Sequence, residues 1–152
     1  MVPELSTDES KLPQRILIVD DDPDYRALVK HHLGKVNDTI SLTELDPEKQ
    51  GLPDERFDWS EHDLVLMDYY FGDKETTGLD LLHANHKKKD FPPVIMLTEA
   101  GNEEIAVKSI KSGCYDYISK KTLTPENLTQ SLQNTWKQFK KNNKYKLDLT
   151  LS

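Results

Sequence analysis

Short apolar runs alternate with segments of helical periodicity along most of the chain. The runs are rich in β-branched residues and are continuous or alternate with a period of two, which is typical of strands in a half-buried or fully buried sheet. We expect five strands, at Arg15 to Val19, Thr39 to Leu45, Leu64 to Met67, Val94 to Leu97 and Tyr115 to Ile118.

Helical patterns separate these expected strands. Asp22 and Pro23 form an N-cap followed by the residue best tolerated in a first helical turn, and Gly34 is expected to end that helix. Further helices are expected at 79–88, at 103–111 and from Pro125 through Trp136. Strands that alternate with helices of this length predict parallel βαβ units in an open α/β sheet with helices on both faces.

The segment 46–63 interrupts this alternation. It contains Pro47, Gly51 and Pro53, and it shows little helical periodicity. We therefore expect the second helix to be short, irregular or absent. Phe57 and Trp59 are expected to pin the resulting loop to the core.

Composition narrows the class of protein. The 152 residues carry a net charge of −7, which argues against direct nucleic-acid binding because the phosphate backbone rewards clustered cations. No apolar run approaches the ~18 residues that span a bilayer, the N-terminus lacks a signal-peptide pattern, and the single Cys114 suits a reducing compartment. These features predict a cytoplasmic domain over 13–141, with a flexible arm over 1–12 and a C-terminal tail over 142–152.

Polar side chains that can carry chemistry stand where the expected strands end. Asp20 and Asp21 follow the first strand, Asp68 the third, Thr98 the fourth and Lys120 the fifth. In an open parallel sheet, ligands bind beyond the carboxyl ends of the strands. We therefore expect these side chains to meet in one site.

Three converging carboxylates repel one another, by about 4 kcal/mol for a pair ~4 Å apart at an effective dielectric constant near ~20. A hard divalent cation relieves this repulsion, and Mg²⁺ suits one or two carboxylates, a carbonyl oxygen and several waters. A phosphoryl group on one carboxylate could then be bound by the cation, the lysine ammonium and the threonine hydroxyl. The set predicts an aspartyl-phosphate site.

These positions resemble the receiver domain of two-component response regulators over about residues 14–137. The matching segments are Ile16 to Pro23, Leu64 to Asp68, Gly78 to Leu82, Pro93 to Thr98 and Gly113 to Lys120. The resemblance implies a flavodoxin-like, doubly wound sheet of five parallel strands in the order 2-1-3-4-5. It also implies signalling rather than enzymatic turnover, with phosphorylation and dephosphorylation catalysed by the domain itself.

The resemblance also implies roles for individual residues. Asp68 is the expected phosphoacceptor and a ligand of Mg²⁺. Asp21 would bind the cation directly and Asp20 mainly through a water, and the main-chain carbonyl of Tyr70 would be a further ligand. The bulk of Tyr70 is expected to shield the acyl phosphate from water and to slow dephosphorylation.

Three further residues would respond to the phosphoryl group. The resemblance implies that Thr98 moves its hydroxyl onto that group, that Lys120 pairs with it, and that Tyr117 follows inward as a switch aromatic. A tyrosine on a short strand can also be an ordinary core residue. The implied partners are a histidine kinase or histidine phosphotransfer protein and a downstream output protein, with a homodimer as one candidate assembly.

The chain departs from the family pattern at three places. The loop 68–78 is two residues longer than usual, and its Gly72-Asp73 turn is expected to replace the common proline. Lys121 stands where the family usually has a cis-proline, and Glu99 stands where a small residue is common.

Two other classes of protein are open alternatives. A metal-dependent phosphohydrolase would need a second acid two residues after the nucleophile, where this chain has Tyr70. A pseudo-receiver would act as a scaffold without phosphorylation. Its usual mark is the loss of an acid, the hydroxyl or the lysine, and all of these are present.

Overall fold

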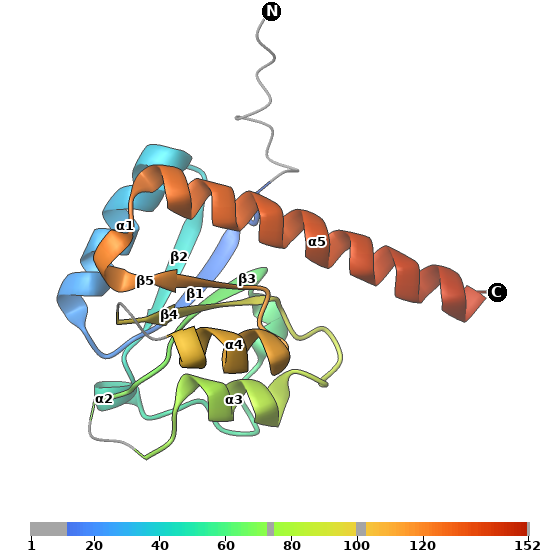
Figure 1. The fold of residues 1–152 in the computed structure, drawn as a ribbon, viewed down its shortest axis with the longest axis horizontal. Coiled ribbons are helices and arrows are strands. Elements are labelled where there is room, and N and C mark those ends of the chain that lie inside the picture. Colours follow the sequence, from blue (N-terminus) through green and yellow to red (C-terminus); the bar gives the residue numbers. More distant parts are fainter. Residues whose placement is uncertain (1–11, 73–74, 100–102, 152) are drawn as a thin grey trace, which may run out of the picture.

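The computed structural model describes residues 12–72, 75–99 and 103–151, with side chains up to residue 144. Five parallel strands form one sheet in the order β2-β1-β3-β4-β5 (Figure 1). The predicted strand order is therefore confirmed. The strands are β1 (Arg15–Val19), β2 (Ser41–Leu45), β3 (Leu64–Asp68), β4 (Val94–Thr98) and β5 (Asp116–Ser119).

Helices cover both faces of this sheet. Helices α1 and α5 lie on one face, and α3 and α4 lie on the other (Figure 1). The bounds are α1 (Pro23–Val36), α2 (Pro47–Gln50), α3 (Gly78–Asn85), α4 (Glu103–Lys111) and α5 (Pro125–Leu151). Two short 3-10 helices, η3 (Trp59–Glu61) and η4 (Lys120–Thr122), complete the order of elements.

Each face of the sheet has its own hydrophobic core. Alternate residues of β1, β3 and β4 point to opposite faces, so a strand buried on both sides contributes to both cores. The core beneath α1 and α5 includes Ile16, Ile18, Leu64, Leu66, Ile95, Leu97, Val29 and Leu132. The core beneath α3 includes Leu17, Val19, Val65, Met67, Val94, Met96, Leu81 and Leu82.

The irregular segment after β2 behaves as the sequence predicts. Helix α2 is a single turn, capped by Asp46 and ended at Gly51, whose φ is 76°. The ring of Trp59 is buried and meets the ring of Phe91 edge to face with centroids 5.2 Å apart. Phe57 packs on Trp59 at 4.8 Å, so the two aromatic residues attach the loop to the core.

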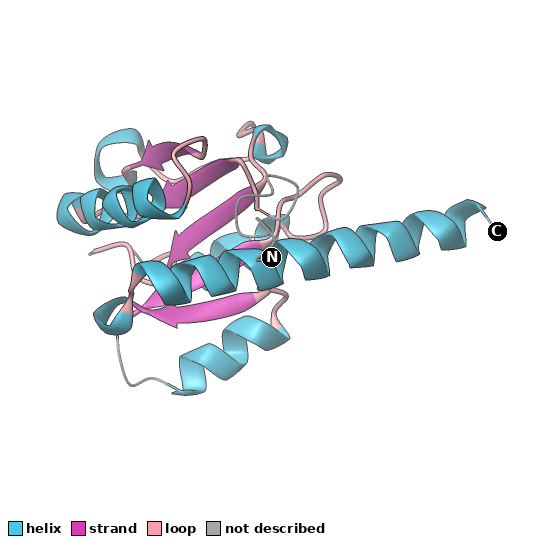
Figure 2. Cartoon of the chain, turned by 90° about the horizontal axis from the view of Figure 1, so that it is seen from above, coloured by secondary structure: helices cyan, strands magenta, loops and turns pink. Residues whose placement is uncertain are grey.

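The ends of the chain differ from the expected boundaries. The residues expected to form a tail continue α5 through Leu151, because 137–151 contains neither proline nor glycine and consists largely of good helix formers. The end of α5 projects beyond the sheet (Figure 2). Leu12, expected at the end of the arm, is buried in the core, and the rest of that arm lies outside the described residues. No helix in the described part of the chain is both long and apolar enough to cross a membrane.

Candidate functional site

The sheet brings the predicted site residues to one edge. Asp68 and Thr98 are the last residues of the adjacent strands β3 and β4. Asp20 directly follows β1, and Lys120 directly follows β5 as the first residue of η4. Because all five strands are parallel, their carboxyl ends point the same way, so the four residues lie at the same end of the sheet, where Asp20, Asp68 and Lys120 are in contact.

Three carboxylates meet at this edge. Asp20, Asp21 and Asp68 each offer an oxygen, and these oxygens lie within 4.8 Å of one another. Asp20 is fully buried and Asp68 is 6% exposed, so water screens their repulsion poorly. Oxygen ligands at this spacing fit a hard divalent cation such as Mg²⁺. The acidic cluster could therefore hold a metal ion.

Lys120 supplies the positive charge of the site. Its Nζ lies 2.7 Å from Oδ2 of Asp20 and 3.2 Å from Oδ2 of Asp68. Burial works against the ammonium cation, but the contacts with Asp20 and Asp68 outweigh it and raise the pKa of Lys120. The lysine therefore remains charged and bridges two acids that would otherwise repel each other.

One lysine does not neutralise the site. Burial, followed by repulsion from Asp20, raises the pKa of Asp68 to about 8, against the opposing effect of Lys120. A carboxyl group with a pKa of about 8 is mostly protonated at neutral pH unless another cation arrives. The protein atoms alone thus leave the site short of positive charge.

The backbone around Asp20 is fixed by contacts that the sequence analysis missed. Arg26 donates from Nη1 to the carbonyl oxygen of Asp20 at 2.8 Å and from Nε to Glu44 at 3.0 Å. It also pairs with Asp46 at 3.6 Å. The amide of Asp22 donates to Oδ1 of Asp20 at 2.9 Å. A single arginine therefore ties α1, β2 and the start of α2 to the acidic turn.

The loop after β3 closes against the acids. The amide of Gly78 donates to the carbonyl of Tyr69 at 2.8 Å. Gly72 has a φ of 63°, and a Cβ there would lie 2.8 Å from Oδ2 of Asp21. Only glycine lets the backbone approach the carboxylate so closely. The expected Gly72-Asp73 turn is described only at its first residue, because Asp73 lies outside the described residues.

Tyr70 follows Asp68 by two residues and is exposed. Its side chain is 56% exposed, and its ring meets the ring of Tyr69 edge to face with centroids 4.6 Å apart. This contact holds a bulky side chain two residues after Asp68. Metal binding by the main-chain carbonyl of Tyr70 stays a prediction.

The hydroxyl of Thr98, at the end of β4, is bonded to the neighbouring backbone. Thr98 is buried, and its Oγ1 donates to the carbonyl of Glu99 at 2.8 Å. Tyr117 is half-buried and pairs in register with Met96, so Tyr117 and Thr98 project from the same face of the sheet. The switch roles of Thr98 and Tyr117 stay predictions.

Lys121, which stands where the family usually has a cis-proline, lies in η4, and the described peptide bonds are all trans.

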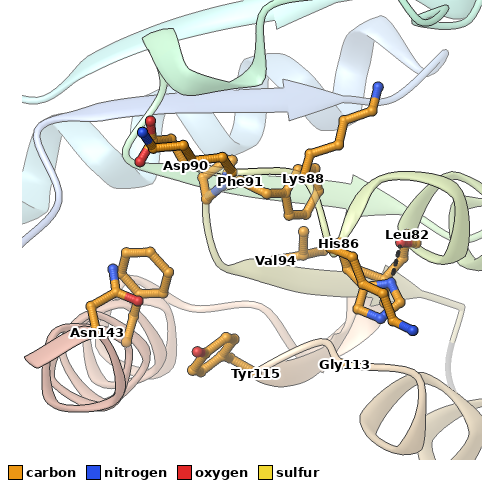
Figure 3. A pocket seen from close by; sticks show the side chains of 13 residues that line it. Leu82, His86, Lys88, Asp90, Phe91, Val94, Gly113, Tyr115 and Asn143 are labelled. Atoms are coloured by element: carbon orange, nitrogen blue, oxygen red, sulfur yellow. Dashed lines mark hydrogen bonds between the residues drawn. The ribbon is translucent and has the colours of Figure 1, made fainter. Parts of the chain in front are cut away.

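A second hollow lies at the opposite edge of the sheet. Figure 3 shows this cleft of about 590 Å³, where Tyr115 leads into β5, Val94 opens β4 and Asn143 of α5 faces them. Its lining is aromatic and basic rather than acidic, with Phe91, Tyr115, Phe139, Lys87, Lys88 and Lys89. It brings no carboxylates together, so it does not share the chemistry of the acidic site.

Comparisons with known proteins agree with this geometry. The chain matches the response regulator receiver domain over residues 16–133. The response regulator protein PilR of Pseudomonas aeruginosa is 33% identical over 108 residues, which are 70% of this chain and 23% of PilR. The transcriptional regulatory protein ResD of Bacillus subtilis is also 33% identical over 108 residues, which are 70% of this chain and 41% of ResD. The crystal structure of NtrX from Brucella abortus aligns with a TM-score of 0.68 at 25% identity, and covers 88% of this chain and 29% of that chain.

The comparisons concern only part of each relative. The chain spans less than a quarter of PilR and less than half of ResD, so their names describe larger proteins. The matched segment 16–133 contains the sheet except for Arg15, the first residue of β1, and every site residue from Asp20 to Lys120. This chain therefore belongs to the response regulator receiver domain family of two-component signalling.

Proposed function

We propose that this domain is the phosphoacceptor of a two-component phosphorelay and takes a phosphoryl group on Asp68 in a Mg²⁺-dependent reaction. One observation carries the proposal. The carboxylate of Asp68 lies 3.2 Å from the ammonium of Lys120, and its oxygen is within 4.8 Å of oxygens of Asp20 and Asp21. A nucleophile, a fixed cation and a set of metal ligands thus share one edge of the sheet.

The chemistry is an in-line transfer. An oxygen of Asp68 attacks phosphorus and forms the new P–O bond, while the P–N bond of a phosphohistidine donor breaks and its electrons stay on the imidazole. Lys120 moves from pairing with the carboxylate to pairing with a phosphoryl oxygen. Thr98 exchanges its bond to the Glu99 carbonyl for one to the phosphoryl group. Bound Mg²⁺ would neutralise the charge that develops on the phosphoryl oxygens.

Phosphorylation would act by shifting a population between two conformations. A phosphoryl group that draws in the Thr98 hydroxyl opens space behind it, and Tyr117, on the same face of the sheet, can move into that space. The affected surface is formed by α4, β5 and α5 and carries the half-exposed side chains of Val107 and Ile110. A partner that binds one conformation better reads the phosphorylation state.

The proposed role is signalling rather than turnover of a free substrate. The proposed donor is a histidine kinase or histidine phosphotransfer protein, and the proposed receiver of the signal is a separate or attached output protein. A phosphorylation-dependent homodimer is one form that the output can take. The support for these partners is family membership together with the exposed apolar residues on α4.

The experiment is incubation with acetyl phosphate and Mg²⁺, followed by intact-protein mass spectrometry. We expect a gain of one phosphoryl group in the wild type, none in Asp68→Asn, and none when EDTA removes the cation. Asp90→Asn is the matched control, because Asp90 lies at the opposite edge with a φ of 62°, which asparagine tolerates. An unmodified wild type would favour the scaffold, and sustained consumption of acetyl phosphate in large excess would favour the hydrolase.

A further inference from the structure

Tyr25 has a buried hydroxyl group without a partner. The residue lies on α1, is 7% exposed, and belongs to the core beneath α1 and α5. Its hydroxyl oxygen has no hydrogen-bond partner within the described part of the chain. Buried polar groups are paired in the large majority of cases, and an unpaired one costs free energy. The hydroxyl therefore needs an explanation that the resting structure does not contain.

The ring of Tyr25 lies beside the acidic site. The ammonium of Lys120 is 4.6 Å from the ring centroid, in a cation–π contact, and the same ammonium is 3.2 Å from Asp68. Burial, then the negative charges of Asp20, Asp68 and Glu99, raise the pKa of the Tyr25 hydroxyl. The group thus stays protonated, and it lies in the electric field of the site's acids.

Packing explains the ring but not the hydroxyl. A phenylalanine could fill the same core position and make the same contact with Lys120, at no cost for an unpaired polar atom. A donor that is buried and protonated, has no partner, and belongs to a ring in contact with the lysine that pairs with both acids suits an anionic acceptor that arrives later. The proposed reaction supplies such an acceptor, because a phosphoryl group adds three anionic oxygens next to Lys120.

We propose that the Tyr25 hydroxyl is a phosphoryl-binding group of this domain and donates a hydrogen bond to an oxygen of the phosphoryl group on Asp68. This inference rests on the proposed function. It adds a third protein donor to Thr98 and Lys120. Helical spacing alone does not reveal this role, because core packing already explains the position of Tyr25 in α1.

Tyr25→Phe tests the inference, because it removes only the hydroxyl. The measurements are thermal denaturation and the affinity for beryllofluoride, a phosphoryl mimic, both in the presence of Mg²⁺. Without beryllofluoride, we expect the variant to be as stable as the wild type or more stable, because an unpaired buried polar atom is gone. We expect its affinity for beryllofluoride to fall by about tenfold, because a hydrogen bond to a charged acceptor is lost.

Tyr115→Phe is the matched control. The Tyr115 hydroxyl accepts a hydrogen bond from Nδ2 of Asn142 at 3.2 Å, at the edge of the sheet opposite the acids. This variant should lose a little stability and bind beryllofluoride like the wild type. We thus expect the loss of the hydroxyl to lower beryllofluoride affinity at Tyr25 but not at Tyr115, and to lower stability at Tyr115 but not at Tyr25.

The outcomes separate this inference from the proposed function. An unchanged affinity in Tyr25→Phe, with a wild type that binds beryllofluoride, would overturn this inference alone. A loss of affinity accompanied by an equal loss of stability without beryllofluoride would also overturn it, because the hydroxyl would then be structural. A wild type that binds neither beryllofluoride nor a phosphoryl group would overturn both.

Discussion

The two edges of the central sheet place their polar groups in opposite situations. At the carboxyl end, Asp20 and Asp68 are buried close together, the pKa of Asp68 rises to about 8, and the Tyr25 hydroxyl is unpaired. At the amino end, the Tyr115 hydroxyl is paired with Asn142, and the Tyr115 ring packs edge to face on Phe139 at 5.9 Å. The carboxyl end buries charged groups close together, whereas the tyrosine hydroxyl at the amino end has a hydrogen-bond partner.

This difference between the two ends of the sheet indicates where the functional site lies. Buried charges that repel one another are concentrated at functional sites, because the same core could otherwise be built from paired or apolar groups. The aromatic cleft of about 590 Å³ at the amino end is lined by aromatic and basic residues and does not bring described carboxylates together (Figure 3). Unsatisfied charge is therefore a better guide to this site than hollow volume.

The largest expected contrast between the edges comes from two glycines. A Cβ on Gly78 would overlap the backbone carbonyl of Asp68 and lie 2.9 Å from Cγ of Met67. We expect Gly78→Ala to lower the free energy of unfolding by about 3 kcal/mol, because rigid backbone has to move. At the amino end, a Cβ on Gly113 meets Cδ2 of His86 at 3.5 Å, an ordinary contact.

Gly113→Ala is thus the control, with a loss of about 1 kcal/mol from its φ of 112° alone. Urea denaturation of both variants measures the difference. Equal losses in the two variants would show that the carboxyl-end edge is no more tightly packed than the amino-end edge.

Much of this site could be predicted because chain order and sheet direction are enough to place it. Once Asp20, Asp68 and Lys120 are assigned to the ends of parallel strands, their convergence follows without any side-chain detail. Tyr25 and Arg26 could not be assigned in the same way. Their roles depend on how α1 rotates onto β1 and β2, and helical periodicity reports only which face is buried.

Sequence patterns also do not predict the length of α5 or the direction of the Thr98 hydroxyl. The sequence pattern predicts too short an α5, because apolar periodicity weakens after Trp136, although helix-forming residues continue to Leu151. The direction of the Thr98 hydroxyl was also beyond prediction. A hydroxyl rotates to the nearest acceptor, and here that acceptor is the carbonyl of Glu99.

The second contrast is in the pH dependence of stability. The pKa of Asp68 is about 8 in the folded protein and lies near its ordinary value of 3.8 when unfolded. Between these values the folded state binds the extra proton, so this group lowers stability as pH rises from about 4 to 8. We expect Asp68→Asn to be about 1–3 kcal/mol more stable than the wild type at pH 8, and similar to it at pH 4 to 5.

Metal binding should remove this contrast. Mg²⁺ at pH 8 would stabilise the wild type more than Asp68→Asn, because the neutral amide is a weaker ligand than a carboxylate. Thermal denaturation across pH, with and without Mg²⁺, measures both effects. A wild type as stable as Asp68→Asn at pH 8 without Mg²⁺ would contradict the strain assigned to the acidic edge.

A smaller effect is expected at Tyr70. Tyr70→Asn removes a bulky exposed ring two residues after Asp68, and if that ring shields the acyl phosphate, water should reach it more easily in the variant. We expect the phosphorylated variant to lose phosphate severalfold faster. Tyr70→Phe is the control, because it keeps the bulk and should keep the lifetime. Decay of the phosphorylated mass after donor removal is the measurement, and equal decay in Tyr70→Asn and the wild type would rule out shielding.

The smallest expected effect is on stability at the amino-end edge. Tyr115→Phe removes the hydrogen bond from Asn142 but keeps the ring contact with Phe139. Because the site is only half-buried, water can replace the lost partner, and we expect a loss of about 0.5 kcal/mol in the free energy of unfolding. Phosphoryl uptake from acetyl phosphate should not change. A gain in stability here would mean that this hydroxyl, like that of Tyr25, is unfavourably placed, and the contrast between the two tyrosines would then be lost.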